Sequence, residues 1–266
     1  MRRLALVGFG LGLLWLFAVW PPPIWYRWVW PGETAFMALR DRQASQLASH
    51  PQRRRESEDG PLERRYQPVR AERIDPDVFA AVLVAEDHRF FEHGGIDYQA
   101  VREALGYRRP DFAIGDERDR AELGRALRDA WTNRREIRGA STITQQLAKN
   151  LYLSPSRNPF RKLKEAVTAY RLEWALGKRR ILELYVNVVE LGPEVWGVEA
   201  ASQTYYRRSA ERLSRDQSAA LAATLPAPLT ANPGYRVGRI RWRQQLILKR
   251  MSREGSIAAA RLGLTE

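Results

Sequence analysis

The most informative stretch of the chain reads EDHRFFEHGG, from Glu86 to Gly95. It places an acidic pair directly after an apolar run, PDVFAAVLVA, that begins at Pro76. Asp75 is a typical N-cap, proline is favoured at the first position of a helix, and the apolar residues of the run recur at helical spacing. We therefore expect a mostly buried helix that carries Glu86 in its last turn.

A carboxylate at the end of a buried helix is a candidate general base. Phe90 and Phe91 follow closely, so we expect the charged form of Glu86 to be partly desolvated. Desolvation raises the pKa of a carboxyl group toward the range that a general base needs. The alternative is a helix-end ion pair with Arg89 or His93, because carboxylates at helix ends are common.

Two later segments carry further chemistry. Residues 139–150 read GASTITQQLAKN and hold many hydroxyls and amides before a single lysine. Buried hydroxyls and amides need hydrogen-bond partners, and a sugar ligand would supply them. Residues 157–165 read RNPFRKLKE, which places Arg161, Lys164 and Glu165 within about one turn of a helix. The alternative for this basic cluster is a solvated, charged helix face.

These segments together resemble the peptidoglycan glycosyltransferases of family 51, the transglycosylase module of penicillin-binding proteins. The stretches beginning at Glu86, Gly139 and Arg161 are similar to the family's E-D-x-x-F-x-x-H-x-G, G-x-S-T-I-T-Q-Q-x-x-K-N and R-K-x-x-E. A fourth stretch, which begins at Lys178, resembles K-x-x-I-L-E-x-Y-L-N. Residues 188–201 are most similar to the monofunctional Gram-negative branch, and the whole resemblance covers roughly residues 64–251.

The resemblance implies a mainly α, lysozyme-like fold with an elongated cleft. It also implies polymerisation of lipid II, the undecaprenyl-pyrophosphate-linked disaccharide-pentapeptide, into glycan strands during cell wall biosynthesis, with release of undecaprenyl pyrophosphate. Glu86 would deprotonate the acceptor hydroxyl in an inverting displacement. Glu165 would be the second catalytic carboxylate, either holding the neighbouring cations or orienting a metal. No cofactor is expected to be required, although Mg²⁺ or Mn²⁺ could accompany the pyrophosphate.

The resemblance also suggests which residues touch the substrate. Those expected to bind the sugars and the pyrophosphate are Asp87, His93, Ser141, Thr144, Gln145, Gln146, Lys149, Arg157, Arg161 and Lys164. In the family, the motif that contains Glu183 and Asn187 is largely structural. No residue is assigned as a metal ligand.

Composition agrees with this interpretation. At 266 residues with 44% hydrophobic content, the chain can bury one sizeable core. Lys and Arg number 44 against 31 acidic residues, and the net charge of +13 favours a polyanionic partner such as nucleic acid, anionic lipid or pyrophosphate. We expect no nucleic acid, because no recognised nucleic-acid motif accompanies the charge. The absence of cysteine excludes disulfides and thiol catalysis.

The N-terminus predicts a membrane location. Residues 4–20 carry no charge and would span roughly 26 Å as a helix, close to the thickness of the hydrocarbon core. A cleaved signal peptide is the rival, but small residues in an A-x-A arrangement are missing near its end. Arg2 and Arg3 would stay in the cytoplasm, and tryptophans between Trp15 and Trp30 would form an interfacial belt. The catalytic domain would then lie in the periplasm, anchored to the bacterial inner membrane by a single pass.

We expect three parts along the chain: the anchor and its aromatic belt over residues 1–30, a polar juxtamembrane connection over 31–73, and a transglycosylase domain over 74–266. An unusually long, charged insertion occupies about residues 108–138, and the alternative there is a solvated helical excursion. No convincing alternation of strands appears. Besides the helix that ends at Glu86, the expected helices cover residues 96–105, 143–151, 160–176, 181–189, 195–206, 216–225 and 240–251.

Two other functions fit parts of the sequence. A membrane-anchored lytic muramidase would also use a glutamate in a lysozyme-like fold, and a non-enzymatic basic scaffold would explain the charge alone. The transpeptidase signatures S-x-x-K, S-x-N and K-T-G do not occur together, because S-x-x-K and K-T-G are absent, so we expect no cross-linking activity. The expected partners are lipid II, the growing glycan strand, the membrane and other cell-wall synthesis proteins.

Overall fold

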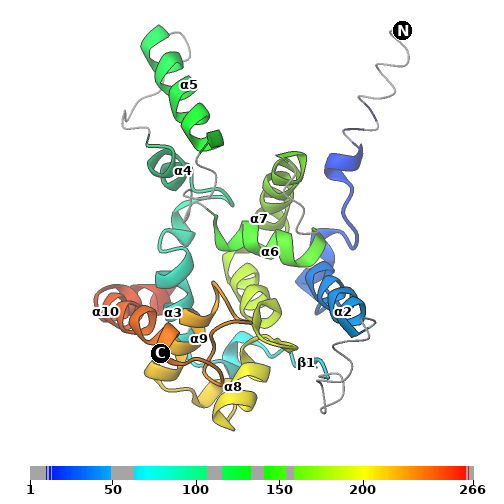
Figure 1. Ribbon diagram of the computed structural model, residues 1–266, viewed down its shortest axis with the longest axis vertical. Coiled ribbons are helices and arrows are strands. Elements are labelled where there is room, and N and C mark those ends of the chain that lie inside the picture. The colour runs from blue at the N-terminus through cyan, green and yellow to red at the C-terminus, as the bar shows by residue number, and fades with distance from the viewer. Residues whose placement is uncertain are drawn as a thin grey trace.

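The computed structural model describes residues 10, 12, 14–48, 63–106, 116–132, 141–153, 159–261 and 263. The described chain is mainly helical, as expected (Figure 1). In chain order its elements are η1 (Pro23–Arg27), α2 (Ala35–Ala48), β1 (Arg65–Tyr66), η2 (Ala71–Arg73), α3 (Pro76–Glu86), η3 (Phe90–Glu92), α4 (Tyr98–Ala104), α5 (Glu117–Thr132), α6 (Ile143–Tyr152), α7 (Pro159–Val188), β2 (Glu190–Gly192), β3 (Val195–Trp196), α8 (Val198–Tyr206), η4 (Ala210–Arg212), α9 (Arg215–Thr224) and α10 (Gly238–Arg261).

Helix α3 forms the centre of one half of the core, as its sequence predicts. Asp75 is its N-cap and accepts a hydrogen bond from the backbone N–H of Asp77 at 2.9 Å. Every residue from Val78 to Val84 is buried. Helices α9 and α10 pack against α3 (Figure 1). The capping box that we expected at the start of α9 is present, with Ser214 as the N-cap and Gln217 as its partner.

The other half of the core consists of α6 packed on α7 (Figure 1). Helix α7 is interrupted at Gly177, whose φ of 73° lies in the left-handed region that glycine adopts without steric cost. The two helices expected at 160–176 and 181–189 are therefore the two arms of one kinked element. The second arm connects the two halves of the core, since its Val186 lines the same small gap as Val82 of α3 and Val198 of α8.

A small sheet corrects the sequence analysis. Strands β1, β3 and β2 form it in that order, with β1 parallel and β2 antiparallel to β3. Val195 and Trp196 lie in β3, whereas we expected a helix from residue 195, and α8 begins only at Val198. Strands of two or three residues are too short to show alternation, so the sequence pattern could not reveal them.

The segment that we expected to be a polar connection contains α2. This helix packs against α6, and Met37 is fully buried. Arg40 ties α2 to β2, because its guanidinium donates from Nε and Nη2 to the two carboxylate oxygens of Glu190 at 2.8 and 2.7 Å. At least part of residues 31–73 is therefore integrated into the folded domain.

The predicted anchor over residues 4–20 lies mostly outside the described residues. Within the part of the chain that the structure describes, no helix combines the length and the apolar character needed to cross a bilayer.

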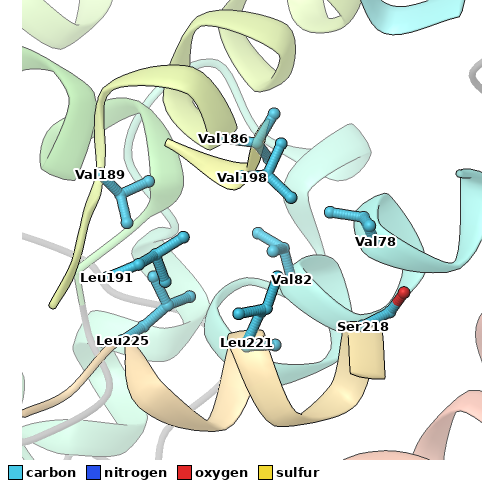
Figure 2. Close-up of a pocket in the computed structure, with 10 residues that line it drawn as sticks. Val78, Val82, Val186, Val189, Leu191, Val198, Ser218, Leu221 and Leu225 are labelled. Atoms are coloured by element: carbon cyan, nitrogen blue, oxygen red, sulfur yellow. The ribbon is translucent and has the colours of Figure 1, made fainter. Parts of the chain in front are cut away.

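Figure 2 shows a cavity in the core, lined by valine and leucine side chains from several elements. Its volume of about 10 Å³ is no larger than one water molecule needs. Ser218 is the one polar residue among those that line it. The cavity is a small packing gap rather than a substrate site.

Candidate active site

Glu86 is the last residue of α3, and three other elements position its carboxylate. Gln146, from α6, donates from Nε2 to Glu86 Oε2 at 2.9 Å. Arg243, from α10, donates from Nη2 to Glu86 Oε1 at 2.8 Å. Tyr185, from α7, fixes the Gln146 amide by donating its hydroxyl to Gln146 Oε1 at 2.9 Å. The carboxylate is thus held where the two halves of the core meet.

The pKa of Glu86 is raised above its ordinary value, and burial is the main cause. Hydrogen bonds from Gln146 and Arg243 and the charges of Arg243 and Lys149 act in the opposite direction. The side chain remains 15% exposed, so a substrate hydroxyl could reach it. A carboxylate that is desolvated yet accessible fits the role of a general base.

The structure corrects the ion-pair partner that we considered for Glu86. Its ion pair is with Arg243 rather than with Arg89 or His93, because Arg89 binds Asp97 and His93 binds Asp87. Sequence reasoning missed Arg243 and Tyr185. Arg243 lies in an arginine-rich helix far along the chain, and no local pattern distinguishes it from solvent-facing arginines.

The second carboxylate, Glu165, lies on α7 and is 2% exposed. Arg161 Nη1 lies 2.8 Å from its Oε2, and Lys162 Nζ contacts its Oε1. Lys149, on α6, is influenced by both carboxylates: burial lowers its pKa most strongly, and the charges of Glu165 and Glu86 raise it. The charges of two glutamates that are 79 residues apart in the chain (165 − 86) therefore both act on the pKa of this lysine.

The placement of Lys164 corrects the sequence analysis. Its Nζ lies 4.6 Å from the ring centroid of Trp15, and burial and the charge of Arg171 lower its pKa. It therefore faces the N-terminal segment rather than Glu165. Residues three and four positions apart share a helix face, so Lys162 and Arg161 reach Glu165 while the adjacent Lys164 points elsewhere. The R-K-x-x-E pattern already indicates this arrangement, because its specified positions are Arg161, Lys162 and Glu165, whereas Lys164 is one of its unspecified positions.

The hydroxyls and amides of residues 139–150 mostly find partners inside the protein. Thr142 is the N-cap of α6 and forms a capping box with Gln145, and its hydroxyl donates to the Gly95 carbonyl at 2.6 Å. Thr144 is fully buried and donates its hydroxyl to Glu173 Oε1 at 2.6 Å. Our premise that a sugar must satisfy these groups is therefore corrected for Thr144 and Gln145. Ser141 is half-buried.

Asp87 and His93 belong to an adjoining buried cluster. Asp87 Oδ2 accepts a hydrogen bond from the backbone N–H of Ile143 at 3.0 Å, and His93 Nε2 lies 3.0 Å from Asp87 Oδ1. These contacts attach the loop after α3 to the start of α6. The contact of both residues with substrate stays a prediction.

One group within the described ranges has the composition of a metal site. Ligand atoms of Asp87, His93 and Asp97 lie within 4.8 Å of one another. Arg89, however, donates to both oxygens of Asp97, at 2.9 and 3.1 Å, and both oxygens of Asp87 are also engaged. Among the side-chain nitrogens and oxygens of Asp87, His93 and Asp97, His93 Nδ1 is the one buried atom without a hydrogen-bond partner in the described structure. One free nitrogen beside a guanidinium does not make a cation site, so the cluster is interpreted as structural.

Two other predictions remain open. Arg157 lies outside the described residues. The same is true of residues 107–115 and 133–140, so only α5 of the expected insertion is described. Figure 1 shows α4 and α5 on the side of the molecule away from α8 and α9.

Comparisons with known proteins identify the family. A model of the transglycosylase family matches residues 55–109 and 118–252. A protein of Bordetella pertussis named biosynthetic peptidoglycan transglycosylase is 40% identical over 238 residues, which cover 90% of this chain and 85% of that protein. A protein of the same name from Thiobacillus denitrificans is 37% identical and covers 93% of this chain and 90% of its own. A third, from Bdellovibrio bacteriovorus, is 43% identical over 69% of this chain and 64% of its own. The chain belongs to the transglycosylase family.

Proposed function

We propose that this protein is a peptidoglycan glycosyltransferase that polymerises lipid II into glycan strands and releases undecaprenyl pyrophosphate. The observation that carries the proposal is the partly buried Glu86 carboxylate, which Gln146 and Arg243 hold, together with the cations around Glu165 on the helix that packs against α6. A base beside a cationic cluster matches a reaction in which a hydroxyl attacks a sugar and a pyrophosphate leaves. The names of the relatives support the same activity.

Glu86 acts as the general base in this mechanism. It takes the proton of the acceptor 4-hydroxyl while the oxygen attacks the anomeric carbon of the growing chain. The bond from that carbon to the pyrophosphate oxygen breaks, and the configuration inverts. Gln146 and Arg243 orient the carboxylate, and the remaining lone pairs of its two oxygens are available for the proton.

Lys149, Arg161 and Lys162 stabilise the departing pyrophosphate. Charge-assisted hydrogen bonds that strengthen as charge develops lower the barrier of such a reaction. Glu165 is a positioning residue in this account, because Arg161 and Lys162 engage its two oxygens. The same contacts leave Glu165 poorly suited to bind Mg²⁺ or Mn²⁺, so no step is assigned to a metal. Gln146 and Ser141 remain candidates for contact with substrate.

The membrane location is part of the proposal. Four side chains on one face of α7 are exposed: Phe160, Leu163, Tyr170 and Trp174. Their spacing of three, seven and four residues forms an apolar stripe. Beside it, Lys164 contacts the Trp15 ring and Arg171 donates to the carbonyl of Phe17, so the N-terminal segment lies along this helix. We propose that the stripe enters the outer leaflet of the inner membrane next to the anchor.

Arg180 fixes the chain where it would leave the bilayer. Its Nε donates to the Tyr26 carbonyl at 2.7 Å, its Nη2 donates to the Val29 carbonyl at 3.3 Å, and its guanidinium lies 4.3 Å from the Trp30 ring centroid. Tyr26 itself is 3% exposed. The segment after the proposed anchor is thus attached to the domain, which would set the orientation of the site relative to lipid-borne substrate.

The muramidase and the scaffold remain the competing functions. A muramidase needs no cationic cluster, and a scaffold needs no buried base. Detergent-solubilised protein incubated with labelled lipid II, and separately with preformed glycan, distinguishes the three. We expect polymer from lipid II and no cleavage of glycan; cleavage alone would identify a muramidase, and no reaction in either tube would favour the scaffold.

The first prediction concerns the base. Glu86→Gln should lower the rate of lipid II polymerisation by about 100- to 10,000-fold, the usual cost of losing a general base. The variant should fold, because a raised carboxyl pKa means that ionised Glu86 is less favourable in the folded state than in the unfolded state, and glutamine removes that charge. A variant with the parent's circular dichroism and a near-parental rate would refute the assignment.

The second prediction compares two neighbouring lysines. Lys162→Ala should lower turnover at saturating lipid II by about tenfold or more, because a contact that strengthens in the transition state acts on kcat. Lys164→Ala is the matched control, since it removes the same charge from the same helix but from the face toward Trp15. Equal turnover numbers for the two variants would show that Lys162 contributes only general surface charge.

The third prediction tests the membrane-facing stripe. In proteoliposomes of phosphatidylethanolamine and phosphatidylglycerol, brominated acyl chains should quench part of the tryptophan fluorescence of the full chain. Trp174→Phe should remove a quenchable component, because Trp174 is 87% exposed within the stripe. Trp242→Phe is the control, since Trp242 is also well exposed but lies on α10. An unchanged quenchable fraction in Trp174→Phe would contradict the proposed orientation.

A further inference from the structure

Arg243 makes two contacts at the end of α3. Its Nη2 donates to the Glu86 carboxylate at 2.8 Å and to the backbone carbonyl of Ala85 at 3.2 Å. The last carbonyls of a helix have no partner within the helix, so the second contact is a C-terminal cap supplied by another element. One guanidinium therefore holds both the backbone at the end of α3 and the side chain of its last residue.

Arg250, which lies further along α10, provides a comparison. Its Nη1 donates to the carbonyl of Val84 at 3.3 Å, one residue before Ala85. Both arginines thus cap the end of α3 from the same helix. Of these two arginines, only Arg243 forms an ion pair with the carboxylate of Glu86 in the described structure. Arg250 therefore shares the capping contact without the carboxylate contact.

We propose that Arg243 is a positioning residue for the base, which aims the Glu86 carboxylate at the acceptor hydroxyl and returns it to the ionised form after each turnover. The inference rests on the proposed function, because it assumes that Glu86 accepts the proton. A guanidinium in a short ion pair with a carboxylate stabilises the charged form. When Glu86 takes the proton, this attraction is lost, so Arg243 favours release of the proton before the next cycle.

The other groups that face Glu86 do not replace Arg243. The charge of Lys149 on α6 also favours the ionised form of Glu86. It lowers the Glu86 pKa less than the charge of Arg243 does, and less than the hydrogen bonds from Gln146 and Arg243 do. Gln146 donates one neutral hydrogen bond. The buried Tyr185 hydroxyl acts on Gln146, and Asp87, next in sequence, is engaged with His93 and Ile143. Arg243 is thus the one cation paired directly with Glu86 within the described part of the chain.

The test is the pH dependence of kcat/KM for lipid II polymerisation by the full-length protein in detergent. Arg243→Gln keeps a hydrogen-bond donor but loses the positive charge, so the Glu86 pKa should rise and the acid limb of the profile should move to higher pH. We expect a shift of about one pH unit, which is the smallest effect usual for an arginine beside a carboxylate. The rate on the acid side of the limb should then fall about tenfold. Arg243→Lys should keep the limb near the parent's position but with a lower plateau, since a single ammonium lacks the guanidinium's fixed geometry.

Arg250→Gln is the matched control, and its acid limb should coincide with that of the parent. A limb that stays in place for Arg243→Gln, or that moves equally for Arg250→Gln, would overturn the inference. So would circular dichroism showing that both Arg243 variants fail to fold, because Arg243 would then be needed for structure alone. Glu86→Gln distinguishes a failure of the proposed function from a failure of this inference. If Glu86→Gln retains activity, the assignment of Glu86 as the base is wrong. If Glu86→Gln is inactive while Arg243→Gln leaves the acid limb in place, only the inference about Arg243 fails.

Discussion

A carboxylate buried at the end of a helix is unfavourable unless other elements hold it in place, and the architecture of this protein meets that constraint at Glu86. Helix α3 brings the residue into the core, α6 and α10 supply the groups that bind its two oxygens, and α7 fixes the amide of Gln146. Burial raises the Glu86 pKa, while a neighbouring arginine and lysine limit the rise. The ionised form of Glu86 is therefore less favourable in the folded protein than in water, and the same shift suits the carboxyl group to exchange a proton.

The same geometry explains why the cationic groups are placed as they are. Glu165 holds Arg161 and Lys162 on one face of α7, and the charges of Glu165 and Glu86 both raise the pKa of Lys149 on α6. A negatively charged leaving group would meet these cations, whereas the acceptor hydroxyl would meet the base. On a neighbouring face of α7, Lys164 and Arg171 hold the N-terminal segment. One helix therefore organises both the proposed pyrophosphate site and the proposed contact with the membrane.

Much of this arrangement could be predicted from local sequence. The N-cap and proline before α3, the capping box of α9 and the positions of most helices follow from short-range rules. Three kinds of feature could not be predicted. Strands of two or three residues show no periodicity, the ion pair of Arg243 joins residues 157 positions apart, and the hydroxyl of Thr144 binds Glu173 on another helix. Lys164 was misplaced for a different reason, because proximity in sequence was read as a shared helix face.

The most direct test of the account is a titration of Glu86 itself. Infrared difference spectra of the parent and of Glu86→Gln, recorded over a range of pH with ¹³C-labelled glutamate, isolate the one carboxyl band that the variant lacks. The account predicts that this band titrates above the ordinary range of a glutamate, because burial outweighs the nearby positive charges. A band that titrates at or below the ordinary glutamate value would contradict the assignment of Glu86 as the general base.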